Sequence, residues 1–131
     1  KAQFNKNKGS KNLIFEIAEE NKFEGQVGNN DIIYFRGGST ERMINKLKQF
    51  SMLKDLLKDK IVGGESAGVN VLSVVCYSFK MGLVYEGLGV IPYKVICHYD
   101  ESKKDKLNGY FDNLKQLNLK EYEYVVFNQE S

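Results

Sequence analysis

The fold is decided by residues 61–68, which read Ile-Val-Gly-Gly-Glu-Ser-Ala-Gly. Ile61 and Val62 are typical of a buried strand, and the residues after Gly68 can continue as a helix. Glycine stands two positions before and two positions after Ser66, where any side chain would collide with the neighbouring strand or helix of so sharp a turn. The stretch therefore predicts a nucleophile elbow, in which a strained backbone turns the Ser66 hydroxyl outward.

Patterned runs on both sides of the elbow predict strands that alternate with helices. Short apolar runs rich in β-formers predict strands at residues 13–17, 32–35, 61–62, 94–97 and 122–127. Apolar residues at helical spacing predict helices at residues 43–57, broken near Ser51, at 69–75 and at 103–117. This alternation is typical of an α/β fold with a mostly parallel sheet covered by helices on both faces.

The composition fits one soluble globular domain over residues 1–131. Hydrophobic residues make up 42% and charged residues 27%, and the net charge of +2 is too small to argue for nucleic acid or an anionic membrane surface as a partner. Apolar runs fall short of the roughly 20 residues of a bilayer span, and the first residues lack a signal-peptide core, so we expect a cytoplasmic protein. Because the sequence begins without methionine and stops after an apolar run, we also expect it to be incomplete at both ends.

Two cysteines and a single histidine argue against the usual zinc sites. Cys76 and Cys97 stand in apolar surroundings without a CxxC or CxxH spacing, which favours reduced, buried thiols over a disulfide. Four zinc ligands would need an unusual arrangement in this sequence. We therefore expect no structural zinc and no cofactor.

Residues 36–40, which read Arg-Gly-Gly-Ser-Thr, predict a second strand-to-helix turn. Ser39 or Thr40 can cap the helix, and Gly38 lets the backbone pass close to a ligand with its amide exposed. The turn lacks the Lys-Ser/Thr ending of a P-loop and the third glycine of a dinucleotide fingerprint. The Gly38 amide is thus a candidate oxyanion-hole donor, and a plain glycine turn with a helix cap is the alternative.

His98 stands at the end of the apolar run at residues 95–97. In open α/β sheets, reactive groups gather at the carboxyl ends of the strands, which is also where the elbow presents Ser66. A nucleophilic serine needs a base that titrates near neutral pH, and this sequence has one imidazole. His98 is therefore the candidate base, and a satisfied surface or core histidine is the alternative.

Three motifs, taken together, resemble a known family. Residues 31–40, residues 64–68, and residues 87–92 through Cys97-His98-Tyr99 recur in the order found in the dipeptidase E and cyanophycinase family of Ser-His-acid peptidases. The resemblance covers most of the chain from about residue 31 onward. It implies a glutamine-amidotransferase-like three-layer sandwich, with part of the sheet missing at both ends of this sequence.

Carried over to this sequence, the family pattern implies Ser66 as nucleophile, His98 as base, and the amides of Gly38 and Ala67 as the oxyanion hole. The implied function is hydrolysis of a short peptide by acyl transfer, with an acidic substrate such as an aspartyl dipeptide. The alternative is a catalytically weakened or non-catalytic interaction or regulatory domain on the same fold. A glutamine amidotransferase fits less well, because such enzymes carry cysteine in the elbow.

The resemblance places the acid of the triad in a short turn after a late strand. Glu130 is the chemically competent residue there, and an ungapped match puts Gln129 in the same position. Glutamine would orient the imidazole but stabilise imidazolium less well, which predicts a slower enzyme. Asp100 and Asp112 are weaker candidates for this role.

The substrate pocket is expected to include Ser39 and Glu65, although Glu65 can also be read as a solvated neighbour of the nucleophile. An acidic substrate needs a cation in the pocket. The cations near the site in sequence are Arg36, Lys103, Lys104 and Lys106. A Lys-rich stretch is more often a solvated face.

Overall fold

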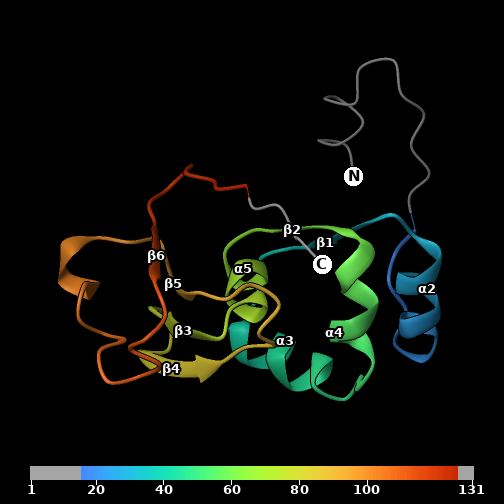
Figure 1. Cartoon of the computed structure of the whole chain (residues 1–131), viewed down its shortest axis with the longest axis horizontal. Coiled ribbons are helices and arrows are strands. Elements are labelled where there is room, and N and C mark those ends of the chain that lie inside the picture. The colour runs from blue at the N-terminus through green and yellow to red at the C-terminus, as the bar shows by residue number, and fades with distance from the viewer. Residues whose placement is uncertain (1–15, 127–131) are drawn as a thin grey trace.

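The computed structural model describes residues 16–126, which form an α/β structure with two sheets (Figure 1). In chain order its elements are η1 Glu20–Lys22, α2 Phe23–Asn29, β1 Ile32–Phe35, α3 Thr40–Leu47, α4 Leu53–Leu56, η2 Leu57–Asp59, β2 Ile61–Gly64, α5 Ala67–Leu72, β3 Val75–Ser78, β4 Leu83–Glu86, β5 Lys94–Cys97, η3 Glu101–Lys103 and β6 Gln116–Leu119. Strands β1 and β2 form one sheet, and the other has the order β4-β3-β5-β6. All described strand pairs are parallel except β3 with β4, which confirms the predicted α/β class.

The first sheet is covered on one face by helices α3 and α4 (Figure 1). Strands β1 and β2 run in register so that Phe35 lies opposite Gly64 at their carboxyl ends. Because side chains alternate along a strand, Ile33 and Phe35 face the core, whereas Ile32 and its partner Ile61 face away and are 51% and 67% exposed. The sheet thus brings the ends of both strand-to-helix turns side by side.

Helix α3 begins at the predicted cap, where the Ser39 Oγ accepts a hydrogen bond from the Arg42 N–H at 3.3 Å. The helical pattern over residues 43–57 is divided between α3, α4 and η2, with turns around Ser51, so the predicted break is confirmed. The apolar faces of these helices share one core cluster, which includes Ile44, Leu47, Leu53 and Leu57.

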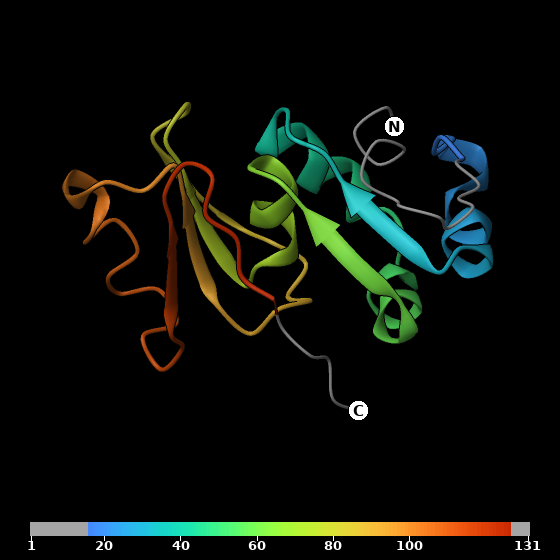
Figure 2. The ribbon, with the colours of Figure 1, turned by 90° about the horizontal axis from the view of Figure 1, so that it is seen from above.

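Helix α5 lies between the two sheets (Figure 2) and contacts β1, β2, β3 and β5. Its Val71 side chain is fully buried. The helix ends at Leu72, earlier than the predicted 75, because Val75 already begins β3 and pairs with Lys94 of β5. By contacting both sheets, α5 fixes the carboxyl end of β5 relative to the elbow.

The helix predicted over residues 103–117 does not form, and that prediction was wrong. The segment instead forms η3, a series of turns and then β6, in which Leu117 pairs with Val95 of β5. Gly109 and Phe111 have φ angles of 87° and 46°, in the left-handed region that interrupts a right-handed helix. Of the apolar residues at helical spacing, Leu107 is fully buried, whereas Tyr110 and Phe111 are exposed, so the stripe does not form one buried face.

The predicted strand at residues 122–127 is also wrong where it can be compared. Tyr122 lies in a turn with φ 64°, residues 123–126 have no regular structure, and residue 127 lies outside the described residues. Most of the strand predicted at 13–17 falls outside them too, and residues 16–17 form no strand. No helix within residues 16–126 is long and apolar enough to cross a membrane.

Candidate active site

The elbow has the backbone that its sequence predicted. Ser66 has φ 50° and ψ −114°, a conformation that costs an L-residue about 1–3 kcal/mol and persists only where the surroundings enforce it. A Cβ at Gly68 would lie 2.0 Å from the Phe35 carbonyl oxygen, and one at Gly64 would lie 2.9 Å from the Gly68 carbonyl carbon. Both glycines are therefore required by close backbone approach, and together they hold the turn that presents Ser66.

The glycine pair of the second turn lies beside the elbow. A Cβ at Gly37 would be 3.6 Å from the Ser66 Cβ, and the Glu65 N–H donates to the Phe35 carbonyl at 3.0 Å. Gly38 has φ 149°, which favours glycine, and lines the same cavity as Ser66. The structure thus brings the predicted Gly38 turn next to the predicted nucleophile.

His98 faces Ser66 from the end of β5. The Ser66 Oγ and the His98 Nε2 are 2.9 Å apart, although the two residues are 32 positions apart in the sequence. His98 has φ 52°, and its side chain is 31% exposed. The distance is that of a hydrogen bond, and it lies within the reach required of a nucleophile and its base.

The other ring nitrogen of His98 contacts Glu121, a residue that sequence reasoning missed. The His98 Nδ1 and Glu121 Oε1 form a short hydrogen bond. An ionised carboxylate only accepts, so Nδ1 donates to it, and this tautomer leaves Nε2 free to accept from the Ser66 hydroxyl. The Glu121 side chain is 64% exposed, so water screens its charge.

Strand pairing explains how Glu121 reaches the imidazole. Cys97 at the end of β5 lies opposite Leu119 at the end of β6, and the Tyr99 N–H donates to the Leu119 carbonyl at 2.9 Å. Residues just beyond both strands therefore meet at one edge of the sheet. The sequence pattern predicts a helix over residues 103–117, so it predicts neither β6 nor the turn after it, where Glu121 lies.

The other predicted acids have different positions. Glu130 and the alternative Gln129 lie outside the described residues. Asp100 caps η3 by accepting a hydrogen bond from the Ser102 N–H at 2.9 Å, and Asp112 accepts one from the Lys94 Nζ at 3.1 Å. A hydrogen bond from the Ser102 hydroxyl lowers the pKa of Asp100, and the one from the Lys94 ammonium lowers the pKa of Asp112.

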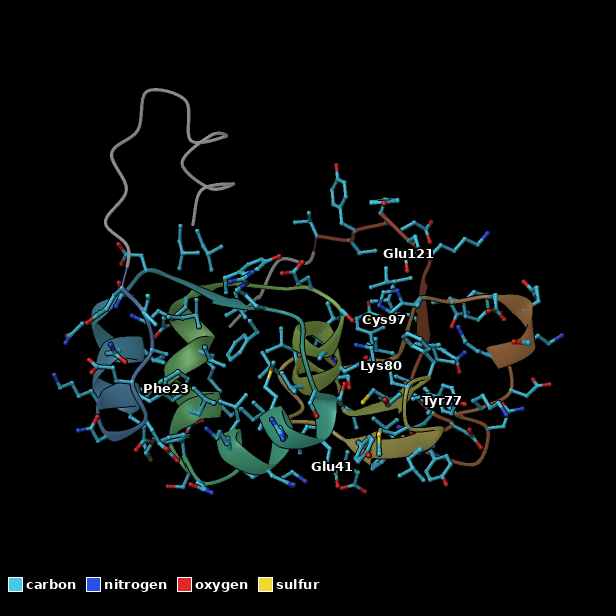
Figure 3. All side chains as sticks on the ribbon, turned by 180° about the vertical axis from the view of Figure 1, so that it is seen from behind. Phe23, Glu41, Tyr77, Lys80, Cys97 and Glu121 are labelled. Carbon is cyan, nitrogen blue, oxygen red and sulfur yellow. The ribbon has the colours of Figure 1, made fainter. Side chains whose placement is uncertain are left out.

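A cavity of about 230 Å³ opens beside Ser66 and His98. It lies between the Gly38 turn and the β3–β4 hairpin, and Ser39 lines it. Glu65 is exposed and does not line it. The hairpin supplies the cation that lines the cavity, Lys80, which the sequence did not single out. Cys97, Lys80 and Glu121 lie toward one end of the molecule, away from Phe23 (Figure 3).

The wall of this cavity contains a buried polar pair. The Asn70 Nδ2 donates to the Thr40 Oγ1 at 3.1 Å and so ties α5 to α3, with both side chains at least nine-tenths buried. Asn70 follows Ser66 by one helical turn, so the pair anchors the start of α5 behind the nucleophile. The polar spacing Ser66 to Asn70 within an otherwise apolar helix is the signal that could have identified it.

Both cysteines are buried thiols. Burial raises the pKa of Cys76 to about 11 and that of Cys97 to about 12. The Cys97 Sγ lies 3.5 Å from the Ser66 carbonyl oxygen, to which it is a weak donor. Both thiols are therefore un-ionised at neutral pH. No group of three or more metal-binding side chains gathers anywhere in residues 16–126.

Comparison with known proteins identifies the family of this sequence. A family model described as peptidase family S51 matches residues 9–130. No curated protein and no solved structure matches the chain. The match spans nearly the entire sequence and confirms the resemblance to the dipeptidase E and cyanophycinase peptidases that the three motifs carried. The chain belongs to peptidase family S51.

Proposed function

We propose that this chain is a serine peptidase in which Ser66 is the nucleophile, His98 the base and Glu121 the acid. The observation that carries the proposal is the 2.9 Å contact between the Ser66 Oγ and the His98 Nε2 at a strained elbow. A serine hydroxyl becomes a useful nucleophile when a positioned base takes its proton. Glu121, on the far side of the ring, supports the same chemistry by stabilising imidazolium.

In the proposed reaction, His98 Nε2 takes the Ser66 proton as Oγ bonds to the peptide carbonyl carbon. The negative charge on the carbonyl oxygen is held by the amides of Gly38 and Ala67. The peptide C–N bond then breaks, and the leaving amine takes the proton from His98. A water molecule then gives a proton to His98 as its oxygen bonds to the acyl carbon. The bond between that carbon and the Ser66 Oγ breaks, Oγ takes the proton back from His98, and the carboxylic acid is released. General-base help is worth about 10² to 10⁴ in rate, and one oxyanion donor about 10² to 10³.

The cavity supports a short peptide as substrate, and Lys80 supports an acidic one. A volume of about 230 Å³ next to Ser66 has room for little more than one or two residues. Of the lysines and arginines in residues 16–126, Lys80 lines the cavity, and no aspartate or glutamate of these residues does. A carboxylate group on the substrate would therefore find an opposite charge, as an aspartyl dipeptide requires.

Hydrolysis of matched dipeptides tests this proposal. Wild-type protein should cleave an aspartyl dipeptide faster than its asparaginyl isostere, and Ser66→Ala should cleave neither. Lys80→Gln should raise KM for the aspartyl substrate about tenfold, with little change for the asparaginyl one, because one charge-assisted hydrogen bond is lost. Lys104→Gln is the matched control, since Lys104 does not line the cavity. A folded wild-type protein that cleaves no short peptide would contradict the proposal and favour an interaction domain.

A further inference from the structure

The turn that carries His98 has an unusual backbone. His98 has φ 52°, in the left-handed region that is uncommon for any residue other than glycine. The Tyr99 N–H is tied to β6 by its bond to the Leu119 carbonyl at 2.9 Å. The His98 carbonyl, on the other side of that peptide bond, needs a partner of its own if the turn is to keep this shape.

Lys103 supplies that partner. Its Nζ donates to the His98 carbonyl oxygen at 2.6 Å and lies 3.2 Å from the Asp100 Oδ2. The Lys103 side chain is only 16% exposed, so this ammonium is held largely away from water. Asp100 is itself fixed, because it accepts the Ser102 N–H at the start of η3. The ammonium therefore closes the turn between β5 and η3.

The same ammonium reaches the imidazole by a second route, through Phe79. The Lys103 Nζ lies 4.9 Å from the centroid of the Phe79 ring, within the range of a cation–π contact. The Phe79 ring packs edge-on against the His98 ring, with centroids 5.0 Å apart and planes at 64°. Phe79 comes from the β3–β4 hairpin, so Lys103 joins three separate segments around one imidazole.

We propose that Lys103 is a positioning residue that holds the His98 imidazole against Ser66, by bonding the backbone of His98 and anchoring the ring of Phe79. The proposal rests on the proposed role of His98 as base. Lys103 touches neither the Ser66 Oγ nor the ring nitrogens, so it acts through other residues. A misplacement of about 1 Å in a catalytic group can cost about 10²-fold in rate.

The neighbouring lysine provides a matched control. Lys104 follows Lys103 directly and is exposed, and its side chain makes no hydrogen bond or ion pair with residues 16–126. Lys103→Met and Lys104→Met each remove one ammonium from the same segment and leave an unbranched chain of similar length. A general effect of net charge would be equal in the two variants, whereas a positioning effect would appear only in the first.

The imidazole itself gives the first readout. Because the sequence contains one histidine, the ring ¹⁵N spectrum reports His98 alone. Wild type and Lys104→Met should show one narrow set of ring signals with Nδ1 protonated, and Lys103→Met should show broadened signals or mixed tautomers. Lys103→Arg, which keeps a donor and a cation, should restore most of the wild-type spectrum. This readout decides the role of Lys103 even if the wild-type protein hydrolyses nothing, in which case the proposed function alone fails.

The second readout is the division between kcat and KM. Lys103→Met should lower kcat for the aspartyl dipeptide by about 10- to 10²-fold and change KM by a smaller factor, because Lys103 does not itself line the substrate cavity. If Lys103→Met does not fold, Asp100→Asn loosens the same ammonium and should move both readouts in the same direction by a smaller amount. Ring signals and kcat that are unchanged in both variants, or changed equally in Lys104→Met, would overturn the proposal.

Discussion

Ser66 departs clearly from ordinary backbone geometry, with φ 50° and ψ −114°. The turn is held by two glycines that allow backbone to approach backbone, and this requirement could be read from the sequence because it is steric. Glu121 could not be read in the same way. Its contact with His98 depends on the pairing of β6, which is a long-range property that no local pattern contains.

Substitution of the elbow glycine tests the steric account. Gly68→Ala should lower the free energy of unfolding by about 3 kcal/mol or more, because its Cβ would lie 2.0 Å from the Phe35 carbonyl oxygen. Gly25→Ala in α2 is the control, since its Cβ would meet nothing within 4 Å, and it should be neutral or stabilising by up to about 1 kcal/mol. Urea unfolding measures both. Equal stability of Gly68→Ala and wild type would refute the close approach.

The identity of the acid can be decided by charge removal at two positions. Glu121→Gln should lower kcat by up to about 10⁴-fold, because it removes the carboxylate that orients His98 and stabilises imidazolium. Glu123→Gln, in the same turn, is the control, since Glu123 accepts from the Lys120 N–H instead. Glu130→Gln tests the residue that the resemblance favoured. A large loss in Glu130→Gln with little change in Glu121→Gln would assign the acid to Glu130.

Thiol chemistry provides a third test at the residue scale. Since burial raises the pKa of Cys97 to about 12 and that of Cys76 to about 11, iodoacetamide at pH 7.5 should modify neither in the folded protein. Both should react in urea, and hydrolysis should be insensitive to the reagent under native conditions. Mass spectrometry counts the modified thiols. Rapid native modification of Cys97, with loss of activity, would point to a thiol nucleophile.

Among the elements, strands β5 and β6 do most to build the site, because their parallel register brings His98 and Glu121 to one edge. Strand β5 was predicted with its observed bounds, 94–97, because residues 95–97 form a short apolar run. Strand β6 was not predicted, because its Leu117 also fits a helical stripe that begins near residue 103. Periodicity cannot separate these two readings where apolar residues, some buried and some exposed, fall at helical intervals in a series of turns.

The start of β5 depends on a buried cation, which gives a pH prediction. Lys94 is 5% exposed, and its Nζ donates to Asp112 at 3.1 Å and to the Leu107 carbonyl at 3.2 Å. The hydrogen bond from Lys94 lowers the pKa of Asp112 below the usual value of about 3.9. A carboxyl with a lowered pKa contributes stability above that value and loses it as the pH falls through the folded pKa.

Asp112→Asn should therefore destabilise the protein at pH 6, because it leaves the Lys94 ammonium buried without its carboxylate. The difference from wild type should be smaller at pH 3, because below the ordinary aspartate pKa of about 3.9 the unfolded chain takes up a proton that folded Asp112 binds less readily. Asp105→Asn, whose carboxylate accepts only from the Asn108 amide among the described contacts, is the control and should change stability little. Urea midpoints at both pH values measure the effect. A difference that is the same at pH 3 and pH 6 would show that ionisation of Asp112 does not matter.

At the scale of the whole molecule, helix α5 joins two sheets that share no strand ladder in the described residues (Figure 2). The α/β class was predictable, because it follows from the alternation of patterned segments. The division into two sheets was not, since it depends on which strands pair. Helix α5 and the central strands of the second sheet contribute fully buried residues, among them Val71, Val75, Val95 and Ile96.

Hydrogen exchange should reflect this arrangement. Backbone amides of α5, β3 and β5 should exchange most slowly, because local opening there would expose the shared core. The turns at residues 104–114 should exchange much faster, since most of their side chains are exposed and their backbone bonds are local. Exchange followed by mass spectrometry distinguishes the two regions. Equal protection of both would contradict a core centred on α5.

The site of reaction with a fluorophosphonate probe tests the central claim, that Ser66 is activated by His98, most directly. We predict one probe per chain, bonded to Ser66 as fluoride leaves, with labelling absent in Ser66→Ala and slowed about 10²- to 10⁴-fold in His98→Gln. Peptide mapping identifies the residue. A folded wild-type protein that stays unlabelled at Ser66, or equal labelling of wild type and His98→Gln, would contradict the claim.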